Sequence, residues 1–433
     1  MCSSNLQPSF TARLTSLNGT RVATGKDFDG TGTASAQVVV LARGRAQELL
    51  AGLEGAQLTV RNREVKRYTS SPKAPFTTST LQQEAGRKLR LSARQVMSTA
   101  QGLYERGFIT YMRTDSTVLS DEAIAEVRSR IAAEHGSDNV NPSVRRYENK
   151  SKNAQEAHEA IRPALPLRSP KEVAGELRGH EMGLYTLIYQ RTLASQMPNA
   201  EGNTVSLRLG TTANDPARSD CEFSASGTTI TKPGYRLAYE ESSDEDDTTD
   251  EEEALLLPPL EEGQSVDVRE WSDTSHTTSP PARYTEASLV KELEARGIGR
   301  PSTWAATIST MVDRGHYVWK KGTALVPTWT AFSVIRLLKQ NFGELVDYDF
   351  TAHVEEDLDC IARGEQQKDR WLHHFYFGDG DDKGLRDIVV ARLDSIDAAA
   401  VNTFDLGAHP DTGEDVIVKP GLYGPYEIGR AHV

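Results

Sequence analysis

The period of the hydrophobic pattern changes three times along the chain. From residue 10 to about 70, apolar and polar residues alternate, as in FTARLTSLNGTRV and AQLTVRNREVKRY, and this period of two predicts strands. Asn18-Gly19 between two alternating runs favours a two-residue hairpin turn. The period becomes helical from Thr77, returns to alternation after about residue 200, and is helical again from Tyr284.

Residues that begin and end helices support this division. TSTLQQEAGRKLRL predicts one helix, and the next begins at Ser92 with Gln95 as the second member of a capping box. Ser120 is the expected N-cap of a helix with two acidic residues in its first turn. SPKEV at 169–173 has the composition of a further helix start, and the apolar run 184–197 predicts a buried helix.

The order β, α, β, α predicts a multidomain α+β protein. An α-helical domain inserted into a β-rich domain explains this order, because the two alternating segments can then share one sheet. The expected segments are 1–75 and 200–283 for the two halves of the β domain, 76–199 and 284–399 for two helical domains, a short segment 400–426, and 427–433. We expect the last seven residues, EIGRAHV, to be foreign to the protein, since they back-translate into a common sequencing adapter.

The composition fits a folded globular protein of several domains. Of the 433 residues, 37% are hydrophobic and 26% charged. The net charge of −13 by itself argues against binding to nucleic acid, but the run 240–253 contains ten acidic residues and no basic one. Without this run the net charge is −3, which leaves room for a basic groove. The acidic run itself is typical of a solvated loop, and binding to a basic protein is the alternative.

The sequence contains no targeting signal that we recognise. No apolar run is as long as a membrane span, and the N-terminus has no basic segment followed by an apolar one. The three cysteines, Cys2, Cys221 and Cys360, form no CxxC pair. A zinc ribbon or a disulfide framework is therefore not indicated, and we expect a cytoplasmic protein without a metal site in this chain.

The loop GFITYMRTDS, residues 107–116, concentrates chemical groups. A tyrosine phenol has a pKa near ~10 and is a poor general nucleophile. Attack on phosphorus suits it, because the phenolate is a moderate leaving group and the step can reverse. Such attack needs positive charge on the phosphoryl oxygens, which the planar guanidinium of Arg113 can supply to a phosphate attacked by Tyr111. Alternatively, Tyr111 is a half-buried strand residue and Arg113 pairs with Asp115.

The segment NAQEAHEAIRP, residues 153–163, is a second candidate. On a helix, His158 and Arg162 would be four residues apart and share a face. Together they can hold a phosphate or a displaced base. Alternatively, they belong to a surface helix whose ion pairs involve Glu156 and Glu159.

The segment RGIGRPSTWAATI, residues 296–308, is a third candidate. Arg300, Ser302 and Thr303 stand where one helix ends and the next begins. An arginine, two hydroxyls and free N–H groups of a helix start make a seat for an anion such as a backbone phosphate. The alternative is a capped turn between helices. The neighbouring aromatic residues can stack on bases or pack in the core; they are Tyr104, Phe108, Trp304, Tyr317 and Trp319.

Taken together, these stretches resemble the type IA DNA topoisomerases. PFTTSTLQQEAGRKL, LYERGFITYMRTDS, NAQEAHEAIRP, YQRTLASQM and YTEASLVKELEARGIGRPSTWA occur in the order in which that family has them. The resemblance extends from about residue 10 to 426 and is strongest to the actinobacterial branch of the bacterial enzymes. It implies a toroidal fold in which a helical domain moves on a β arch to let a DNA strand pass.

The resemblance implies roles for single residues. Tyr111 is the expected nucleophile that forms a 5′-phosphotyrosine, and Arg113 the arginine that stabilises the phosphate. The remaining expected contacts to DNA are Asp115 beside the nucleophile, His158 on the scissile strand, Arg162 in the same motif, and Arg300, Ser302 and Thr303 in the seat of the last helical domain. Segment 400–426 resembles the start of a C-terminal DNA-binding repeat.

The family's N-terminal Toprim domain is not recognisable in this sequence. That domain contains the acidic residues that bind Mg²⁺, so we expect a magnesium cofactor whose ligands are outside this chain, and no ATP. The expected partner is the single-stranded part of negatively supercoiled DNA, bound by a monomer in the bacterial nucleoid. We interpret the chain as a fragment of an ATP-independent topoisomerase. The alternative is a catalytically inactive DNA-binding remnant; a tyrosine phosphatase or recombinase is disfavoured, because their catalytic residue patterns are missing.

Overall fold

The structure, a computed structural model, describes residues 9–148, 159–240, 257–313, 317–380, 382–421 and 424–429. The chain forms two compact units, and each contains segments that are far apart in the sequence. The first unit consists of Met1–Lys73, Ile131–Ser143 and Leu193–Ala282, and the second of Ala74–Arg130, Val144–Thr192 and Arg283–Val433.

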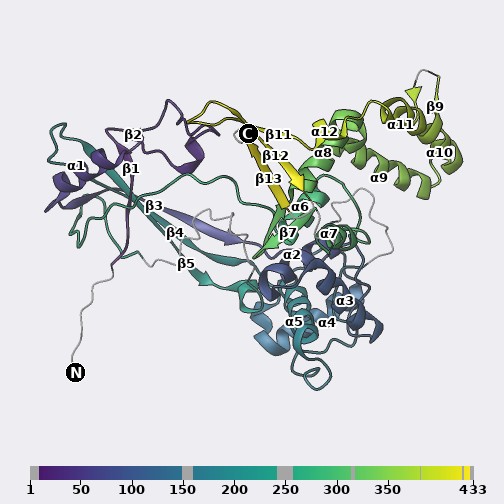
Figure 1. Cartoon of the computed structure of the whole chain (residues 1–433). Helices are drawn as coiled ribbons and strands as arrows, with labels where there is room; N and C mark the ends of the chain where they lie inside the picture. Colours follow the sequence, from purple (N-terminus) through teal and green to yellow (C-terminus); the bar gives the residue numbers. More distant parts are fainter. Residues whose placement is uncertain are drawn as a thin grey trace. The chain divides into compact units, whose positions relative to one another are not determined.

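The first unit is built on one antiparallel sheet of six strands in the order β2-β1-β5-β4-β3-β6 (Figure 1). The strands are β1 (Arg13–Leu17), β2 (Thr20–Arg21), β3 (Leu58–Ser70), β4 (Ala200–Thr212), β5 (Asp220–Lys232) and β6 (Ser265–Val266). β3 pairs with β4 from Thr59 opposite Gly210 to Ser70 opposite Ala200. The expectation that both alternating segments share a sheet is therefore confirmed.

The core of the first unit covers only part of this sheet. Leu49 and Leu53 of α1 (Arg43–Leu53) pack with strand residues such as Leu207 and Phe223. β3 contributes buried side chains only at its start, and from Arg61 to Arg67 every side chain is exposed. Backbone pairing, rather than side-chain packing, therefore holds this middle part of β3 in the sheet.

Two local features of the first unit test predictions made from the sequence, one of which is confirmed and one of which is wrong. Asn18 and Gly19 have φ values of +50° and +78°, so the predicted hairpin turn between β1 and β2 is confirmed. The segment GYRLAY was expected to be a strand but contains the 3₁₀ helix η3 (Gly234–Leu237). Gly234 has a φ of +53°, and a Cβ atom there would lie 2.2 Å from the carbonyl oxygen of Asn199. This close approach turns the chain and prevents the strand.

The helix α1 was also missed, because residues 10 to 70 were predicted to be strands. Its sequence RGRAQELLAGL places Leu49 and Leu53 four residues apart, so both reach the core from one helical face. The remaining short helices of this unit are η1 (Gly25–Asp27) and η2 (Ser137–Asn139).

The second unit is mainly helical (Figure 1). Its helices are α2 (Thr78–Leu89), α3 (Ala93–Glu105), α4 (Asp121–His135), α5 (Gly179–Ala194), α6 (Glu286–Ala295), α7 (Trp304–Asp313), α8 (Trp329–Phe342), η4 (Gly343–Val346), α9 (Tyr348–Ala362), α10 (Lys368–Phe377), α11 (Leu385–Leu393) and α12 (Ala398–Val401). The last residues of α4 and α5 belong to the first unit. Its strands form two hairpins, β7 (Val318–Lys321) with β8 (Ala324–Pro327) and β9 (Gly378–Asp379) with β10 (Asp382–Lys383), and a sheet of β11 (Phe404–Ala408), β12 (Asp415–Gly421) and β13 (Gly424–Gly429).

The predicted helix starts are present in two of three cases. Ser92 and Gln95 form the expected capping box of α3, and the Ser120 hydroxyl accepts a hydrogen bond from the Ala123 N–H at the start of α4. Ser169 and Glu172 exchange hydrogen bonds of 2.6 and 3.4 Å, but the chain then forms only turns. Gly175 follows, and its low helix propensity, a penalty of about 1 kcal/mol, helps to stop a helix there.

We predict that Leu207→Ala lowers the free energy of unfolding by about 2–5 kcal/mol, because the Leu207 side chain is fully buried in the sheet core. Urea denaturation followed by circular dichroism measures this change. Val65→Ala on the exposed part of β3 is the control, with an expected change within about 0.5 kcal/mol. Equal losses for the two variants would show that the core does not end where the structure places it.

Candidate active site and nucleic-acid interface

The tyrosine loop, residues 106–120 between α3 and α4, begins with a buried anchor. Gly107 has a φ of +75° and turns the chain away from α3. Phe108 is buried, and its ring packs edge-on against Tyr185 at a centroid distance of 6.2 Å. The guanidinium of Arg106 lies 5.0 Å from the centre of the Phe108 ring. These contacts fix the start of the loop to α5.

Thr78 holds the centre of the tyrosine loop. Its hydroxyl donates to the Met112 carbonyl at 2.7 Å and accepts from the Thr114 N–H at 2.8 Å. Its backbone N–H also donates to the Thr114 carbonyl at 2.9 Å. Thr78 is fully buried at the start of α2, whose N-cap is Thr77. The first turn of α2 therefore supplies hydrogen-bond partners to the backbone N–H and C=O groups of a loop that is part of no sheet.

Burial alternates along the held segment. Met112, Thr114 and Ser116 are buried, whereas Tyr111 and Arg113 are exposed. The Tyr111 side chain is 42% exposed, and its ring meets Tyr104 of α3 edge-on at a centroid distance of 5.3 Å. The phenol and the guanidinium are thus both presented to solvent from a fixed backbone.

Arg113 does not pair with Asp115. Within the described part of the chain, neither the guanidinium of Arg113 nor the carboxylate of Asp115 forms a hydrogen bond or an ion pair. The alternative interpretation of the loop, in which Arg113 pairs with Asp115, is therefore not what the structure contains. A permanently charged side chain that has no partner among the described residues and lies two residues from an exposed tyrosine is suited to bind an anion.

The segment around Arg162 is extended, not helical, so the prediction of a shared helical face with His158 is wrong for the part that is described. His158 itself lies outside the described residues. Ile161 bridges to Phe76 and Pro163 to Ile109, which places this segment beside the tyrosine loop. The proline gives the physical reason, because it disfavours helical backbone in the residue before it.

Arg162 is buried, and its guanidinium is occupied. It donates to the Glu159 carboxylate at 2.5 Å and to the Pro163 carbonyl at 2.9 Å. Glu159 in turn accepts from the Ser120 N–H at 2.7 Å. Burial alone raises the pKa of the Glu159 carboxyl, but the hydrogen bonds from Ser120 and Arg162 outweigh this effect and hold the pKa below its usual range. Arg162 thus supports the C-terminal end of the loop through Glu159.

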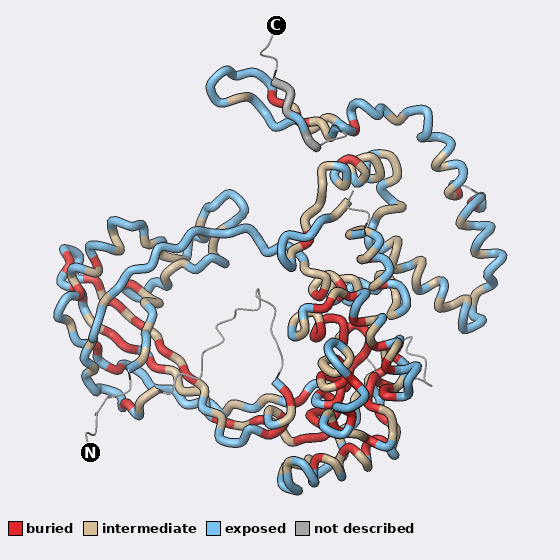
Figure 2. The backbone as a smooth tube through the Cα atoms, turned by 60° about the horizontal axis from the view of Figure 1, so that its bottom comes forward, coloured by how far each residue is buried: buried red, intermediate tan, exposed pale blue. Residues whose placement is uncertain are grey.

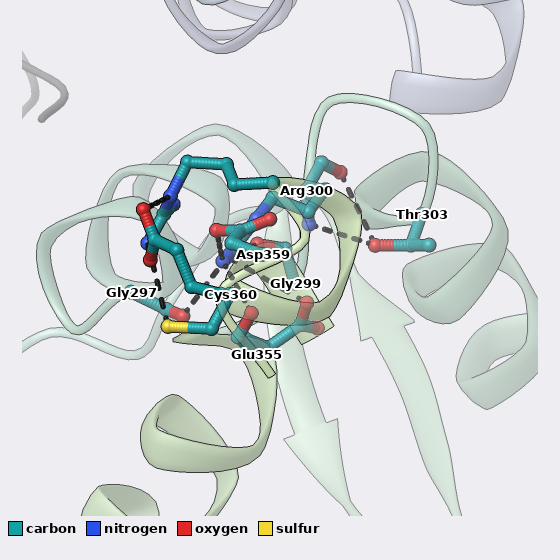
Figure 3. Close-up of polar contacts among 9 residues, drawn as sticks. Gly297, Gly299, Arg300, Thr303, Glu355, Asp359 and Cys360 are labelled. Atoms are coloured by element: carbon teal, nitrogen blue, oxygen red, sulfur yellow. Dashed lines mark hydrogen bonds and ion pairs between the residues drawn. The ribbon is translucent and has the colours of Figure 1, made fainter. Parts of the chain in front are cut away.

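The turn between α6 and α7 contains the third group of predicted residues (Figure 3). The Arg300 guanidinium donates to the Gly299 carbonyl at 2.8 Å, to the Glu355 carbonyl at 3.1 Å and to the Asp359 carboxylate at 2.6 Å. Arg300 therefore ties the turn to α9. Its positive charge faces a carboxylate in this structure.

The two hydroxyl residues of this turn differ in their contacts. Thr303 accepts from the Arg300 N–H at 2.9 Å and donates to the Arg300 carbonyl at 3.2 Å, so its hydroxyl shapes the turn (Figure 3). The Ser302 side chain is exposed and has no hydrogen-bond partner among the described residues. Ser302, just before α7, is therefore the hydroxyl that remains available to an anion.

Polar contacts within the second unit connect α2 and α3 to α6 and α7. Ser79, the neighbour of Thr78, donates to the Glu294 carboxylate at 2.5 Å. The Ala93 N–H donates to Glu286 at 2.6 Å, and a further ion pair joins the start of α3 to the end of α7. The helix that holds the tyrosine loop thus also contacts the helix that leads to Ser302.

Two residues that position the loop were not predicted to do so from the sequence. Thr78 received no role, and Glu159 was considered only as a member of ion pairs on a surface helix, although each makes the central hydrogen bonds described above. A signal exists for Thr78: TTST at 77–80 has four hydroxyl residues where one N-cap suffices. Glu159 gives no such signal, because its partner Ser120 is 39 residues away.

The described residues contain no group of three or more His, Cys, Asp or Glu side chains that could hold a metal ion. The segment DFDGTG at 27–32 contains two aspartates, and the carboxylates of both are occupied. Asp27 accepts from Arg21 at 2.8 Å, and Asp29 accepts from the Thr33 N–H at 2.9 Å. These residues do not fit Mg²⁺, and no chemical step is assigned to a metal here. Nor is any described helix long and apolar enough to cross a membrane.

Comparison with known proteins identifies a family for this chain. Residues 20–373 match the family described as DNA topoisomerase. DNA topoisomerase 1 of Mycolicibacterium smegmatis is 51% identical over 97% of this chain and 46% of its own length, and that of Streptomyces coelicolor is 48% identical over 96% and 45%. The structure of full-length topoisomerase I from Thermotoga maritima is similar with a TM-score of 0.68 at 30% identity, over 92% of this chain and 62% of that chain. The chain thus spans about half the length of the curated relatives it matches.

We predict that Thr78→Val loosens the tyrosine loop, whereas Thr78→Ser, which keeps the hydroxyl, does not. The valine leaves buried polar groups of residues 112 and 114 without a partner, at a cost of about 1–3 kcal/mol. Hydrogen exchange of a peptide covering 108–118 should become roughly tenfold faster in the valine variant only. Unchanged exchange in Thr78→Val would show that the hydroxyl does not hold the loop.

We also predict that Glu159→Gln lowers thermal stability in a pH-dependent way. The pKa of Glu159 is lower in the folded protein than in the unfolded chain. The ionised carboxylate therefore stabilises the fold fully at pH values above the ordinary pKa of a glutamate, and this stabilisation is lost as the pH falls through the lowered pKa of the folded protein. The difference in melting temperature between wild type and variant should therefore be larger at pH 7 than at pH 4. Glu344→Gln on an exposed residue is the control. A difference that grows on acidification would contradict the prediction.

Proposed function

The chain belongs to the DNA topoisomerase family, and from this premise we propose that Tyr111 is the nucleophile that cleaves one DNA strand. The phenol oxygen attacks a backbone phosphorus, the bond between phosphorus and the 3′ oxygen breaks, and a 5′-phosphotyrosine forms. The phenol loses its proton and the released 3′ oxygen gains one. Reversal of the step rejoins the strand, and ATP is not needed because the phosphotyrosine ester preserves the bond energy.

The observation that carries this proposal is the joint exposure of Tyr111 and Arg113 from a segment held by Thr78. A phosphoryl group attacked by Tyr111 accumulates negative charge on its non-bridging oxygens. Arg113 is only two residues from Tyr111 in the sequence, and its guanidinium can stabilise this charge. Because no described residue occupies the Arg113 guanidinium, DNA binding does not have to break an ion pair first. Tyr104 restricts the orientation of the Tyr111 ring through its edge-on contact.

The other predicted residues divide into two groups. We propose that Asp115, His158 and Ser302 contact the DNA backbone or a displaced base near the cleavage point. The polar contacts of Arg162, Arg300 and Thr303 with other protein groups favour positioning roles, since these contacts hold the loop or the turn. In this interpretation Arg300 places Ser302 and the start of α7.

The substrate we propose is the single-stranded part of negatively supercoiled DNA, bound by a monomer in the bacterial nucleoid. The resemblance to type IA enzymes supports this substrate, and transient cleavage with strand passage is then the route to relaxation. The family uses Mg²⁺, whose expected acidic ligands belong to the Toprim domain. Because the chain spans about half of its relatives, the alternative function is DNA binding without cleavage.

We predict that the chain, incubated with end-labelled single-stranded DNA and Mg²⁺, forms a covalent adduct that survives denaturation. Tyr111→Phe should abolish the adduct, because the attacking oxygen is lost. Arg113→Ala should lower adduct formation by about 10²-fold, with Arg113→Lys intermediate, because the lysine keeps the charge but not the fork.

Dissociation constants measured at two salt concentrations provide the control, because all variants should still bind DNA and bind it less tightly at high salt. An adduct that persists in Tyr111→Phe would rule out the proposed role of this residue. Binding without an adduct in wild type would favour the alternative function.

A further inference from the structure

A cavity of about 530 Å³ opens on the first unit beside the end of α1. One wall consists of Leu50 and residues 54–57, and the other is the segment 267–271 that follows β6. Figure 2 shows the buried core of this unit in red along the strands, with exposed chain in pale blue around it. A cavity of this volume can hold a small molecule or one long side chain.

Contacts within the first unit fix the shape of this cavity. Val268 and Trp271 pack against the sheet core, and the Trp271 ring lies 5.2 Å from the ring of Phe223 at an interplanar angle of 51°. The Gln57 side-chain amide donates to the Asp267 carboxylate at 2.8 Å and so joins the two walls. The cavity therefore presents an aromatic ring that is held in place from behind.

The cavity has an excess of negative charge. Its lining contains the three carboxylates of Glu54, Asp267 and Glu270 and one basic residue, Arg269, which gives a net charge of −2. Within the described ranges of the chain, the carboxylates of Glu54 and Glu270 form no hydrogen bond or ion pair. Two carboxylates of the lining are thus available to a ligand.

The end of α1 adds to this negative potential. Glu54 is the C-cap of α1, and the last turn of this helix contains no basic residue. The C-terminal end of a helix carries a partial negative charge and favours a cation nearby. The helix and the carboxylates therefore favour the same kind of ligand, whereas a nucleic-acid phosphate is repelled.

The arrangement suits an organic cation better than a metal ion. Among the described residues, no three His, Cys, Asp or Glu side chains lie close enough together to hold a metal ion. The carboxylates of this cavity are therefore spaced for a larger charged group. An aromatic ring attracts ammonium and guanidinium groups, and a guanidinium also binds carboxylates through two parallel hydrogen bonds.

We propose that this cavity binds an organic cation, a guanidinium or primary ammonium group on an apolar stem. Glu54 and Glu270 bind the charged group, and Trp271 contacts the stem. The ligand joins the end of α1 to the segment 267–271. Its source is either a free amine or a side chain of a basic polypeptide. This binding goes beyond the function proposed for Tyr111 and uses no residue of the tyrosine loop.

The test is a fluorescence titration of the whole chain with Nα-acetyl-arginine amide. We expect a dissociation constant on the order of 1 mM, and binding about tenfold weaker for the citrulline compound, which has nearly the same shape but no charge. Trp271→Phe, which keeps a ring against Phe223, should remove the fluorescence change.

The double variant Glu54→Gln/Glu270→Gln should bind the arginine compound about tenfold less tightly, because both available charges are lost. Glu344→Gln/Glu414→Gln is the matched control, since it changes the net charge equally at exposed positions outside the cavity and should keep the affinity.

Two further ligands distinguish the sources of the cation. Tighter binding of agmatine, a free guanidinium amine, than of the peptide Gly-Arg-Arg-Gly supports a free ligand, and the reverse order supports a side chain of a polypeptide.

Four results would overturn the proposal. They are equal binding of the arginine and citrulline compounds, unchanged affinity in Glu54→Gln/Glu270→Gln, a fluorescence change that persists in Trp271→Phe, and no fluorescence change with any of the cations. The first two would show that charge does not select the ligand, and the third would place the ligand elsewhere in the chain.

Discussion

The hydrogen bonds of the Thr78 hydroxyl are the interaction on which the candidate site depends. The segment that follows Tyr111 lies outside any helix or sheet, and buried backbone groups in such a segment need partners. Thr78 supplies them from the first turn of a capped helix. Because the backbone of this segment is fixed, its side chains alternate between buried and exposed positions. The chemical groups at 111 and 113 are exposed together for this reason.

The surroundings of the loop extend the same arrangement. Glu159 accepts from Ser120 at the far end of the loop and is itself held by Arg162. Charged side chains near Tyr111 in the fold thus perform two different tasks. Arg162 is buried and satisfied by protein groups, whereas Arg113 is exposed and unclaimed by the described residues. Burial and partners, not residue type, separate a positioning arginine from one that can meet a substrate.

Local sequence signals predicted local structure well. The Asn18-Gly19 turn and the capping box of Ser92 need only neighbouring residues, and both are present. Among features that depend on distant residues, the pairing of β3 with β4 was predicted, but others were missed. The extended course of the segment around Arg162 depends on bridges to other segments, and α1 was hidden within a region of alternating residues. The carbonyls and carboxylate that occupy Arg300 come partly from α9, more than 50 positions later.

The middle of β3 has a mechanical consequence. From Arg61 to Arg67 the strand is exposed on both faces but remains paired with β4 through its backbone. Bending this stretch of β3 about an axis in the plane of the sheet separates none of its own side chains from a packed core, and the ladder hydrogen bonds can stay intact. Stretching it along its length would strain covalent geometry, and shearing it would break the ladder. This stretch of β3 therefore resists bending less than it resists extension or shear.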